Sequence, residues 1–438
     1  MRDLAMLIGF LAMLAPVFRY PHIGVLVWCW TAMIVPGSLL FGFMWWVPFN
    51  KITAVITLVI WLMSREPRKV PMTSTIVLLA AFAVLGTVSA WNGIGDPATT
   101  MAQWSDFAKV MVFPFVVAGL ITSKVRIDGL LYAIYLSLGF HGIAEGAKFL
   151  ISAGGHQVWG PRGSAISDNN HFALAMVVIL PIVLYLYRQT AHRILKLALL
   201  GSSLLVMASI MGTTSRGGLL GIAAMGGYAF VCTSKKFKYA LAVLPLIAVA
   251  VTFAPERWSN RMDTIQTADA DESFMTRVVA WKLSTLIAMD HPLLGGGFHA
   301  VQDFPVWVDY SRTFSKLDFI PSPPPNPDRP HAAHSIYFQV LGDMGFLGLG
   351  IYIAILVSTW RNASAVIRRV RDRPEVQWAG ALATSLKYSL IAYMVSGAAL
   401  SLAYFEYMYM IFALLVVLRR IIGEPARVPR WATKMRAA

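Results

Sequence analysis

The stretch His334–Thr359, HSIYFQVLGDMGFLGLGIYIAILVST, decides the fold class. Asp343 is its only Lys, Arg, Asp or Glu residue, and a helix of about 20 mainly apolar residues crosses the hydrocarbon core of a bilayer. Nine further apolar runs of roughly this length occur along the chain. They cover residues 74–91, 107–122, 128–150, 169–187, 194–212, 217–232, 238–253, 383–400 and 403–419. The sequence therefore predicts an all-α polytopic membrane protein.

The composition of the whole chain agrees with this prediction. Of the 438 residues, 57% are hydrophobic and 13% are charged, whereas soluble domains are about 45 to 50% apolar and about 25% charged. The two cysteines, Cys29 and Cys232, lie inside apolar runs. This placement excludes a disulfide framework and a cysteine-based metal site.

The first 64 residues allow more than one interpretation. Their apolar runs are short, at 4–18, 23–35, 37–49 and 51–64, and prolines separate them. Between two and four spans can be drawn there. We interpret the first run as a retained span, because no small-residue cleavage site follows it. The expected total is 12 spans, with 11 to 14 allowed.

The net charge of +15 reflects topology. Basic clusters lie on alternate connections, as the positive-inside rule requires of cytoplasmic loops. A nucleic-acid-binding patch would not skip every second loop, so we expect no nucleic-acid partner. The clusters are Arg65, Arg68 and Lys69; Lys124 and Arg126; Arg188, Arg193 and Lys196; Lys235, Lys236 and Lys238; and Arg361, Arg368, Arg369, Arg371 and Arg373. The C-terminal tail is basic as well, which predicts a cytoplasmic C-terminus.

One substantial segment, residues 254–333, lies outside the membrane on the opposite, periplasmic side. It holds ten acidic and seven basic residues, so its net charge is −3 and the remaining chain carries +18. We expect a helix over 271–289, a glycine-rich turn at His291–Gly297 and an extended stretch at Pro321–Pro330. The predicted regions are N-terminal spans 1–253, this periplasmic segment 254–333, C-terminal spans 334–419 and a cytoplasmic tail 420–438.

Two residues at the outer ends of spans are candidates for chemistry. Arg216 lies in the turn GTTSRGG (212–218) and offers a planar fork suited to two phosphate oxygens. A lone arginine there could equally extend to lipid headgroups. His334 stands where the chain re-enters the membrane, and a histidine can act as a general base near neutral pH. An interfacial histidine that only helps to start a helix is the alternative.

Further polar residues lie on the same predicted side. Arg277 is on the expected periplasmic helix, and Arg162 and the run Asp168–His171 are on another outer loop. Solvated loop charges and helix caps explain each of them separately. Taken together, three arginines and a histidine could converge on an anionic substrate whose tail lies in lipid.

Nucleotide, metal and cofactor chemistry are all disfavoured. The sequence has no phosphate-binding loop and no dinucleotide-binding turn. His331 and His334 lack a third ligand at suitable spacing, and the acids Asp269, Asp271 and Glu272 precede a helix whose first turn favours acids. We expect no metal and no cofactor. Asp343, Lys387 and Glu406, which lie inside predicted spans, could instead form an ion pathway.

Four motifs in this order resemble the bacterial O-antigen ligase and polymerase superfamily. They are TSRGGLLG from Thr214, Arg277 with Trp281, HPLLGGG from His291, and HSIYFQVLGDMGFLG from His334. The N-terminal sequences MRDL and RYPHIGVLVW, from Met1 and Arg19, are similar to the branch described as O-glycosylation ligases associated with exosortase systems.

The resemblance implies a GT-C-like glycosyltransferase of the bacterial inner membrane with its active site facing the periplasm. Such an enzyme transfers a glycan from undecaprenyl diphosphate to the lipid A-core oligosaccharide in lipopolysaccharide biosynthesis, without a metal. It implies that His334 activates the acceptor hydroxyl and that Arg216 and Arg277 bind the diphosphate, with Arg162 a looser match. Because the motif reads His331-Ala-Ala-His334-Ser here, His331 competes with His334 for the role of base.

Other activities remain open. An O-antigen polymerase uses a second lipid-linked glycan as acceptor, and a protein O-glycosylation ligase uses a protein hydroxyl. A transporter of the lipid-linked glycan is an alternative of another class, with Asp343, Lys387 and Glu406 as coupling groups. The absence of a visible inverted repeat argues against transport. No nucleophilic carboxylate is evident for a two-step route, so direct attack with inversion at the anomeric carbon is expected.

Overall fold

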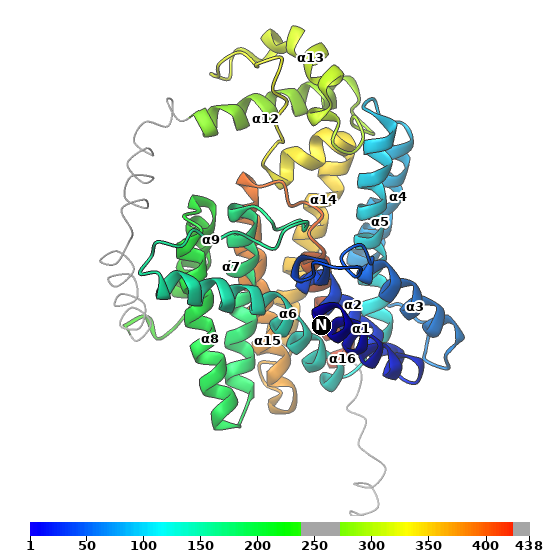
Figure 1. The fold of residues 1–438 in the computed structure, drawn as a ribbon, viewed down its shortest axis with the longest axis vertical. Helices are drawn as coiled ribbons and strands as arrows, with labels where there is room; N and C mark the ends of the chain where they lie inside the picture. Colours follow the sequence, from blue (N-terminus) through cyan, green and yellow to red (C-terminus); the bar gives the residue numbers. More distant parts are fainter. Residues whose placement is uncertain (238–271, 424–438) are drawn as a thin grey trace, which may run out of the picture.

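The computed structural model describes residues 1–237 and 272–423 of the chain (Figure 1). These residues form α-helices and short 3-10 helices, with no strand among them. The α-helices before the gap are α1 (Arg2–Leu14), α2 (Pro21–Ile34), α3 (Phe49–Met63), α4 (Ser74–Trp91), α5 (Pro97–Leu120), α6 (Lys124–Ile151), α7 (Asn169–Gln189), α8 (Arg193–Gly212) and α9 (Arg216–Cys232). Those after it are α12 (Glu272–Asp290), α13 (Phe304–Arg312), α14 (Ile336–Arg369), α15 (Gln377–Ser396) and α16 (Glu406–Gly423).

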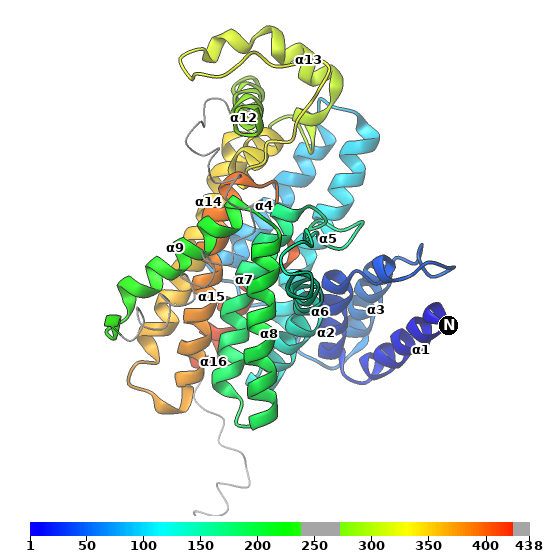
Figure 2. The same ribbon diagram turned by 60° about the vertical axis from the view of Figure 1, so that its left-hand side comes forward.

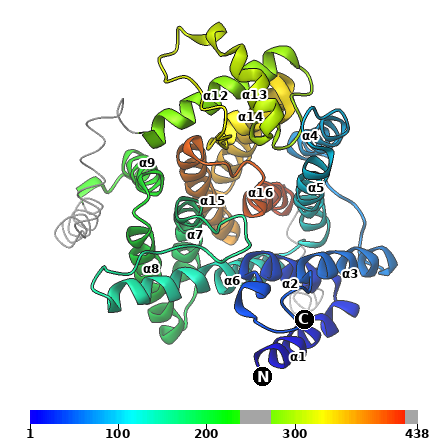
Figure 3. The ribbon, with the colours of Figure 1, turned by 45° about the horizontal axis from the view of Figure 1, so that its top comes forward.

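Helix α16 forms the centre of the bundle. Every residue from Tyr407 to Leu418 is buried, as expected of a helix that is apolar on all sides. Helices α5, α14 and α15 pack against it, and α7 packs against α15. Figures 2 and 3 show α7, α8 and α15 on one side of this centre and α4 with α5 on the other.

The prediction of an all-helical membrane protein is confirmed. Each predicted apolar run from residue 74 onward that the structure describes lies wholly or mostly within one α-helix. Among the described residues, five helices, α4, α6, α7, α8 and α14, are long and apolar enough to cross a membrane. The predicted span 238–253 and the acids Asp269 and Asp271 lie outside the described residues.

The N-terminal region differs from the expected series of spans. Helices α1, α2 and α3 have 13, 14 and 15 residues, or roughly 20 Å each at 1.5 Å per residue, less than the ~30 Å hydrocarbon core. Helix α1 continues into a 3-10 helix, η1 (Ala15–Phe18), so the first run is helical throughout, and its interpretation as a retained span stays a prediction. The run 37–49 is not a helical span: it holds the end of a 3-10 helix, η2 (Pro36–Leu39), and a series of turns. Pro36 and Pro48, which bound it, keep the chain from continuing as one helix.

Helices elsewhere begin at side chains that accept a hydrogen bond from their first turn. Thr73, Asp96, Ser123, Asp168 and Ser215 cap α4, α5, α6, α7 and α9 in this way. Such N-caps satisfy backbone N–H groups that have no partner inside the helix. These polar residues therefore fix where these five helices start.

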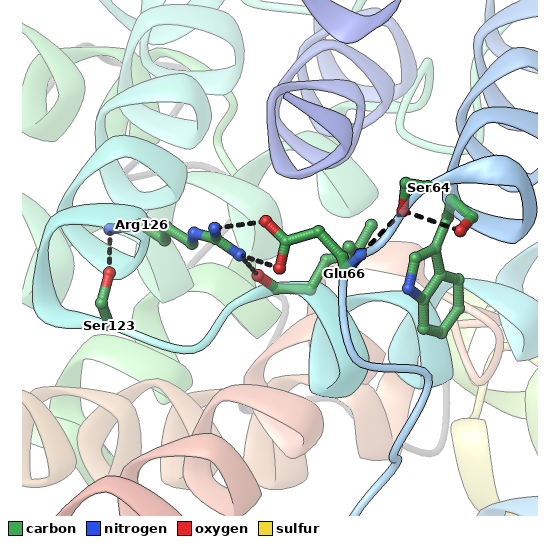
Figure 4. Close-up of polar contacts among 6 residues, drawn as sticks. Ser64, Glu66, Ser123 and Arg126 are labelled. Carbon is green, nitrogen blue, oxygen red and sulfur yellow. Dashed lines mark hydrogen bonds and ion pairs between the residues drawn. The ribbon is translucent and has the colours of Figure 1, made fainter. Parts of the chain in front are cut away.

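Two arginines, one of them paired with a glutamate, bind the C-terminal end of α5. Both nitrogens of the Arg126 fork donate to Glu66, at 2.6 and 3.2 Å, and Arg126 also donates to the Leu120 carbonyl at 2.7 Å (Figure 4). This contact holds the pKa of Glu66 below its usual range. Arg420 donates to the carbonyls of Ala118 and Ile121. These basic residues thus bind the last carbonyls of α5, where a helix dipole favours cations.

Residues 272–333 form a small unit on the bundle (Figure 1). The predicted helix 271–289 is confirmed as α12, and its apolar side chains form a cluster with α13 that includes Leu283, Ile287, Trp307 and Tyr310. Lys282, buried in this unit, has its ammonium 3.8 Å from the Phe314 ring centroid. The backbone N–H of Asp96 donates to Asp303, so the start of α5 lies at this end of the molecule. Because α5 has 24 residues, or about 36 Å, the Arg126 contacts lie at the opposite end.

Helix α14 is broken near one third of its length. Gly345 has φ 66°, which is not helical. The predicted glycine turn His291–Gly297 packs against this break: Gly296 and Gly297 donate to the carbonyls of Gly342 and Asp343 at 2.8 and 3.1 Å, and Phe346 donates to the Pro292 carbonyl at 2.9 Å. The turn therefore supplies partners for backbone groups that the break would otherwise leave unpaired inside the bundle.

Replacing Gly345 tests this packing. A Cβ at Gly345 would lie 2.6 Å from the Pro292 carbonyl oxygen and would also hold an L-residue in the left-handed region. We expect G345A to lower the free energy of unfolding by about 2 kcal/mol or more, seen as a lower thermal midpoint in detergent. Gly350, in the same helix with nothing within 4 Å of its Cβ position, is the matched control. An equal effect of G350A would contradict the proposed role of the turn.

Candidate functional site

His334 lies in the short connection between the Pro-rich stretch and α14. Its backbone N–H donates to the Ser401 hydroxyl at 2.8 Å, and the preceding carbonyl, of Ala333, accepts from the Trp281 indole at 2.6 Å. Trp281, on α12, stacks on Phe338 of α14 with an interplanar angle of 7°. The connection is thus held by α12 on one side and by the loop before α16 on the other.

The imidazole of His334 is half-buried and makes no hydrogen bond within the described part of the chain. Ser335 is the N-cap position of α14, and no side chain caps that helix. The alternative of a histidine that starts the helix is therefore not supported. Backbone φ at His334 is 44°, a left-handed conformation that is uncommon outside glycine and concentrates at functional sites.

Burial, followed by the positive charge of Arg277, lowers the pKa of His334 to about 4. His171, Asp168 and His331 also act on it electrostatically, and only Asp168 acts in the opposite sense. Residues from α7, α12 and the 331–335 connection, far apart in sequence, therefore lie near one imidazole. A neutral imidazole at neutral pH can accept a proton.

Arg216 is half-buried in the first turn of α9, and hydrogen bonds fix the turn before it. The carbonyl of Thr213 accepts from the Asn169 amide of α7 at 2.9 Å, and the carbonyl of Gly217 accepts from the Ser396 hydroxyl of α15 at 2.7 Å. Thr214 adopts φ 54°, unusual for a β-branched residue. An arginine at the positive end of a helix dipole is suited to an anion.

The glycines of this turn have two roles. A Cβ at Gly218 would lie 2.8 Å from the Cβ of Ala173, so this glycine allows α9 to approach α7. Gly217 has no neighbour closer than 3.8 Å at its Cβ position and leaves room beside Arg216. Gly218 therefore permits close helix packing, and Gly217 borders open space.

Arg162 is placed differently from the other two arginines. It is exposed in the loop before α7 and lines a cavity of about 680 Å³ whose lining includes neither Arg216 nor Arg277. Ser401, which accepts the His334 N–H, lines the same cavity. The cavity therefore reaches the backbone contact that holds His334.

His331, the competing histidine, faces the unit formed by α12 and α13. Its ring lies 5.9 Å from the ring of Trp307 on α13, at an interplanar angle of 72°. His334 is instead tied to the loop before α16. The two histidines are thus held by different parts of the molecule.

Three ionisable residues predicted inside the spans have separate local partners. Asp343 accepts from the Tyr404 hydroxyl at 2.8 Å and from the His299 N–H at 3.1 Å. Glu406 accepts from the Trp28 indole at 3.1 Å. Lys387 donates to Ser364, and its ammonium lies 3.9 Å from the Trp360 ring centroid.

Other residues of the site had no signal in the sequence. Ser401 and His299 stand in loops with no motif, and only the folded chain brings them beside His334 and Asp343. Within the described residues, no three side chains of His, Cys, Asp or Glu gather in a way that could hold a metal ion.

Comparison with known proteins identifies two regions of the chain. Residues 201–353 match the family model described as O-antigen ligase, and residues 1–191 match a family of unknown function. No curated protein matches the chain. The resemblance to the O-antigen ligase superfamily is therefore confirmed for residues 201–353, which include Arg216, Arg277 and His334.

The low proton affinity of His334 is measurable. In protein labelled with ¹³C-histidine, we expect the His334 signal, assigned by its loss in H334A, to titrate near pH 4. Removing the nearby positive charge with R277Q should raise this pKa. Because an unfolded histidine titrates near 6.5, this residue's contribution to stability is complete above about pH 6.5 and is lost as the pH falls towards 4. A titration at 6.5 that R277Q leaves unchanged would contradict the described surroundings of His334.

Proposed function

We propose that this protein, with its O-antigen ligase domain at residues 201–353, is a glycosyltransferase that moves a glycan from undecaprenyl diphosphate to the lipid A-core oligosaccharide. The observation that carries the proposal is the His334 imidazole, half-buried, without a hydrogen bond in the described residues, and under the positive charge of Arg277. A base kept neutral beside a cation suits a reaction between a hydroxyl and a diphosphate-activated sugar.

The proposed reaction proceeds in one displacement. The acceptor oxygen attacks the anomeric carbon, the bond from that carbon to the diphosphate oxygen breaks, and the configuration inverts. His334 takes the proton of the acceptor hydroxyl. Arg216 and Arg277 stabilise the negative charge that grows on the leaving undecaprenyl diphosphate. Arg162 binds substrate from the side of the cavity that it lines, and neither metal nor cofactor has a role.

The membrane arrangement is part of the proposal. We infer about 12 spans in a GT-C-like bundle of the bacterial inner membrane, with regions 1–253, 254–333, 334–419 and 420–438 as predicted. The positive-inside rule supports a cytoplasmic location for the end of α5 that Arg126 and Arg420 contact. The unit of α12 and α13, at the other end of α5, then faces the periplasm together with His334.

Transport is less well supported as the main activity. Asp343, Glu406 and Lys387 each have their own hydrogen-bond partners from different elements. Proton or ion coupling would require these groups to exchange charge along a path. The polymerase and the protein O-glycosylation ligase share the donor chemistry, and the choice of acceptor separates them from the proposed ligase.

Substitution of His334 tests the proposed base. Purified protein in nanodiscs would receive undecaprenyl-diphosphate glycan together with lipid A-core, a second lipid-linked glycan or an acceptor protein, and the lengthened product would be identified. We expect lipid A-core to be lengthened and H334A to lower the rate about 10²- to 10⁴-fold. H331A, at the competing histidine, is the matched control and should retain most of the rate. Full activity of H334A, or loss only in H331A, would remove His334 from the role of base.

Substitution of Arg216 tests diphosphate binding. Lysine keeps the charge but loses the planar fork that can hold two oxygens. We expect R216K to lower kcat/KM about tenfold or more, the cost of a charged hydrogen bond. R312K is the matched control, because Arg312 on α13 is 75% exposed, and it should keep the wild-type kcat/KM. Unchanged kcat/KM in R216K would exclude Arg216 from the site.

A further inference from the structure

The cavity beside His334 is built by both matched regions of the chain. Its walls come from the end of α2, the start of α3, the first half of α5, the loop before α7 and the loop before α16. The first four of these lie in residues 1–191, which match the family of unknown function, and His299 and Gln339, which also line the cavity, lie in residues 201–353. At about 680 Å³, it lies within the roughly 300 to 1,000 Å³ typical of ligand sites.

The lining combines aromatic and polar groups. Trp45, Phe405 and Tyr404 contribute rings, and Gln103 and Gln339 contribute amides. Walls of this kind bind ligands that have both apolar faces and hydroxyl groups. A saccharide has this chemistry.

One buried acceptor in the lining lacks a partner. The side-chain oxygen of Asn50 is buried and has no hydrogen bond in the described part of the chain. Buried polar atoms are nearly always hydrogen-bonded. A hydroxyl group of a ligand would satisfy this oxygen.

Two cations in the lining also lack partners. Of the charged residues there, Lys109 forms an ion pair with Asp106 at 2.6 Å, and Glu406 accepts from Trp28. The side chains of Lys51 and Arg162 are exposed and have no ion pair or hydrogen bond among residues 1–237 and 272–423. They come from α3 and from the loop before α7, so two separate elements each contribute a cation to the lining.

The cavity also adjoins the proposed base. Ser401 both lines it and accepts the His334 N–H, and His299 both lines it and donates its N–H to Asp343. Two residues of the lining, Val35 and His299, adopt the left-handed conformation, with φ 50° and 63°. Arg216 and Arg277, proposed to bind the donor, do not line the cavity.

We propose that this cavity binds the acceptor, as a saccharide that carries a phosphate or carboxylate group. The anionic group lies between Lys51 and Arg162, and a sugar hydroxyl donates to Asn50. The name acceptor rests on the proposed glycosyltransferase function, because the base must meet the hydroxyl that it activates. The binding of an anionic saccharide rests on the cavity alone.

Binding is the direct test, because it needs no turnover. Protein in nanodiscs would be titrated with three probes: lipid A-core with phosphorylated core sugars, the same material after dephosphorylation, and lipid A-core whose only core anion is a uronate. If the cavity recognises phosphate, we expect K51A and R162A each to raise the Kd of the phosphorylated probe about tenfold. If it recognises a carboxylate, we expect the same increase for the uronate probe. Both variants should bind the neutral-core probe as the wild type does. K69A and R65A, at exposed residues outside the cavity, are matched controls and should keep the wild-type Kd for every probe.

Two results would overturn the proposal. One is a wild-type protein that binds all three probes equally. The other is a set of cavity variants that weaken binding of undecaprenyl diphosphate and leave the saccharide probes unaffected, since the cavity would then serve the donor. If binding behaves as expected but no product forms with any acceptor, the glycosyltransferase function fails and the anionic-saccharide site stands. Thermal midpoints of K51A and R162A equal to that of the wild type would show that these substitutions leave the fold intact.

Discussion

The helical hydrogen bonding of α14 is interrupted at Gly345 inside the bundle, and the rest of the site depends on which groups bond to the backbone there. Unpaired peptide groups are costly where water is absent. Here the partners come from the turn His291–Gly297, which belongs to the unit formed by α12 and α13. Satisfying the break therefore fixes this unit on the membrane bundle. Trp281 of α12 can then reach the Ala333 carbonyl and hold the connection that carries His334.

The same break explains why several glycines occur close together. Gly295 and Gly345 both have positive φ, and a Cβ on either would meet the backbone of the other segment within 2.6 Å. The two segments approach as closely as strands do, and only residues without a side chain permit this. The glycine-rich turn His291–Gly297 that the sequence predicts therefore has a structural role here.

Most of the helices from residue 74 onward could be predicted from the sequence, but the contacts between them could not. Apolar runs and capping residues such as Asp168 set the helices, since these signals are local. Arg216 could be chosen as a candidate from the sequence because a charge at the outer end of a span is costly unless it has a role. The position of Arg162 on a separate cavity, and the contacts of Ser401 and His299, depend on loops from distant parts of the chain. The sequence also left the number of spans in the first 64 residues open, because hydropathy does not show where a proline-bounded run stops being helical.

The charges around His334 fit a site that changes when its donor arrives. Burial and the positive charge of Arg277 hold the imidazole of His334 neutral. In the proposed reaction a diphosphate, with its negative charge, binds to Arg277 and Arg216. Its charge offsets that of Arg277 and makes the imidazole a stronger base by favouring its protonated form. The donor would thereby raise the proton affinity of His334 at the moment when the acceptor hydroxyl must lose its proton. A histidine placed among arginines is thus consistent with a base that stays weak until the anionic substrate is in place.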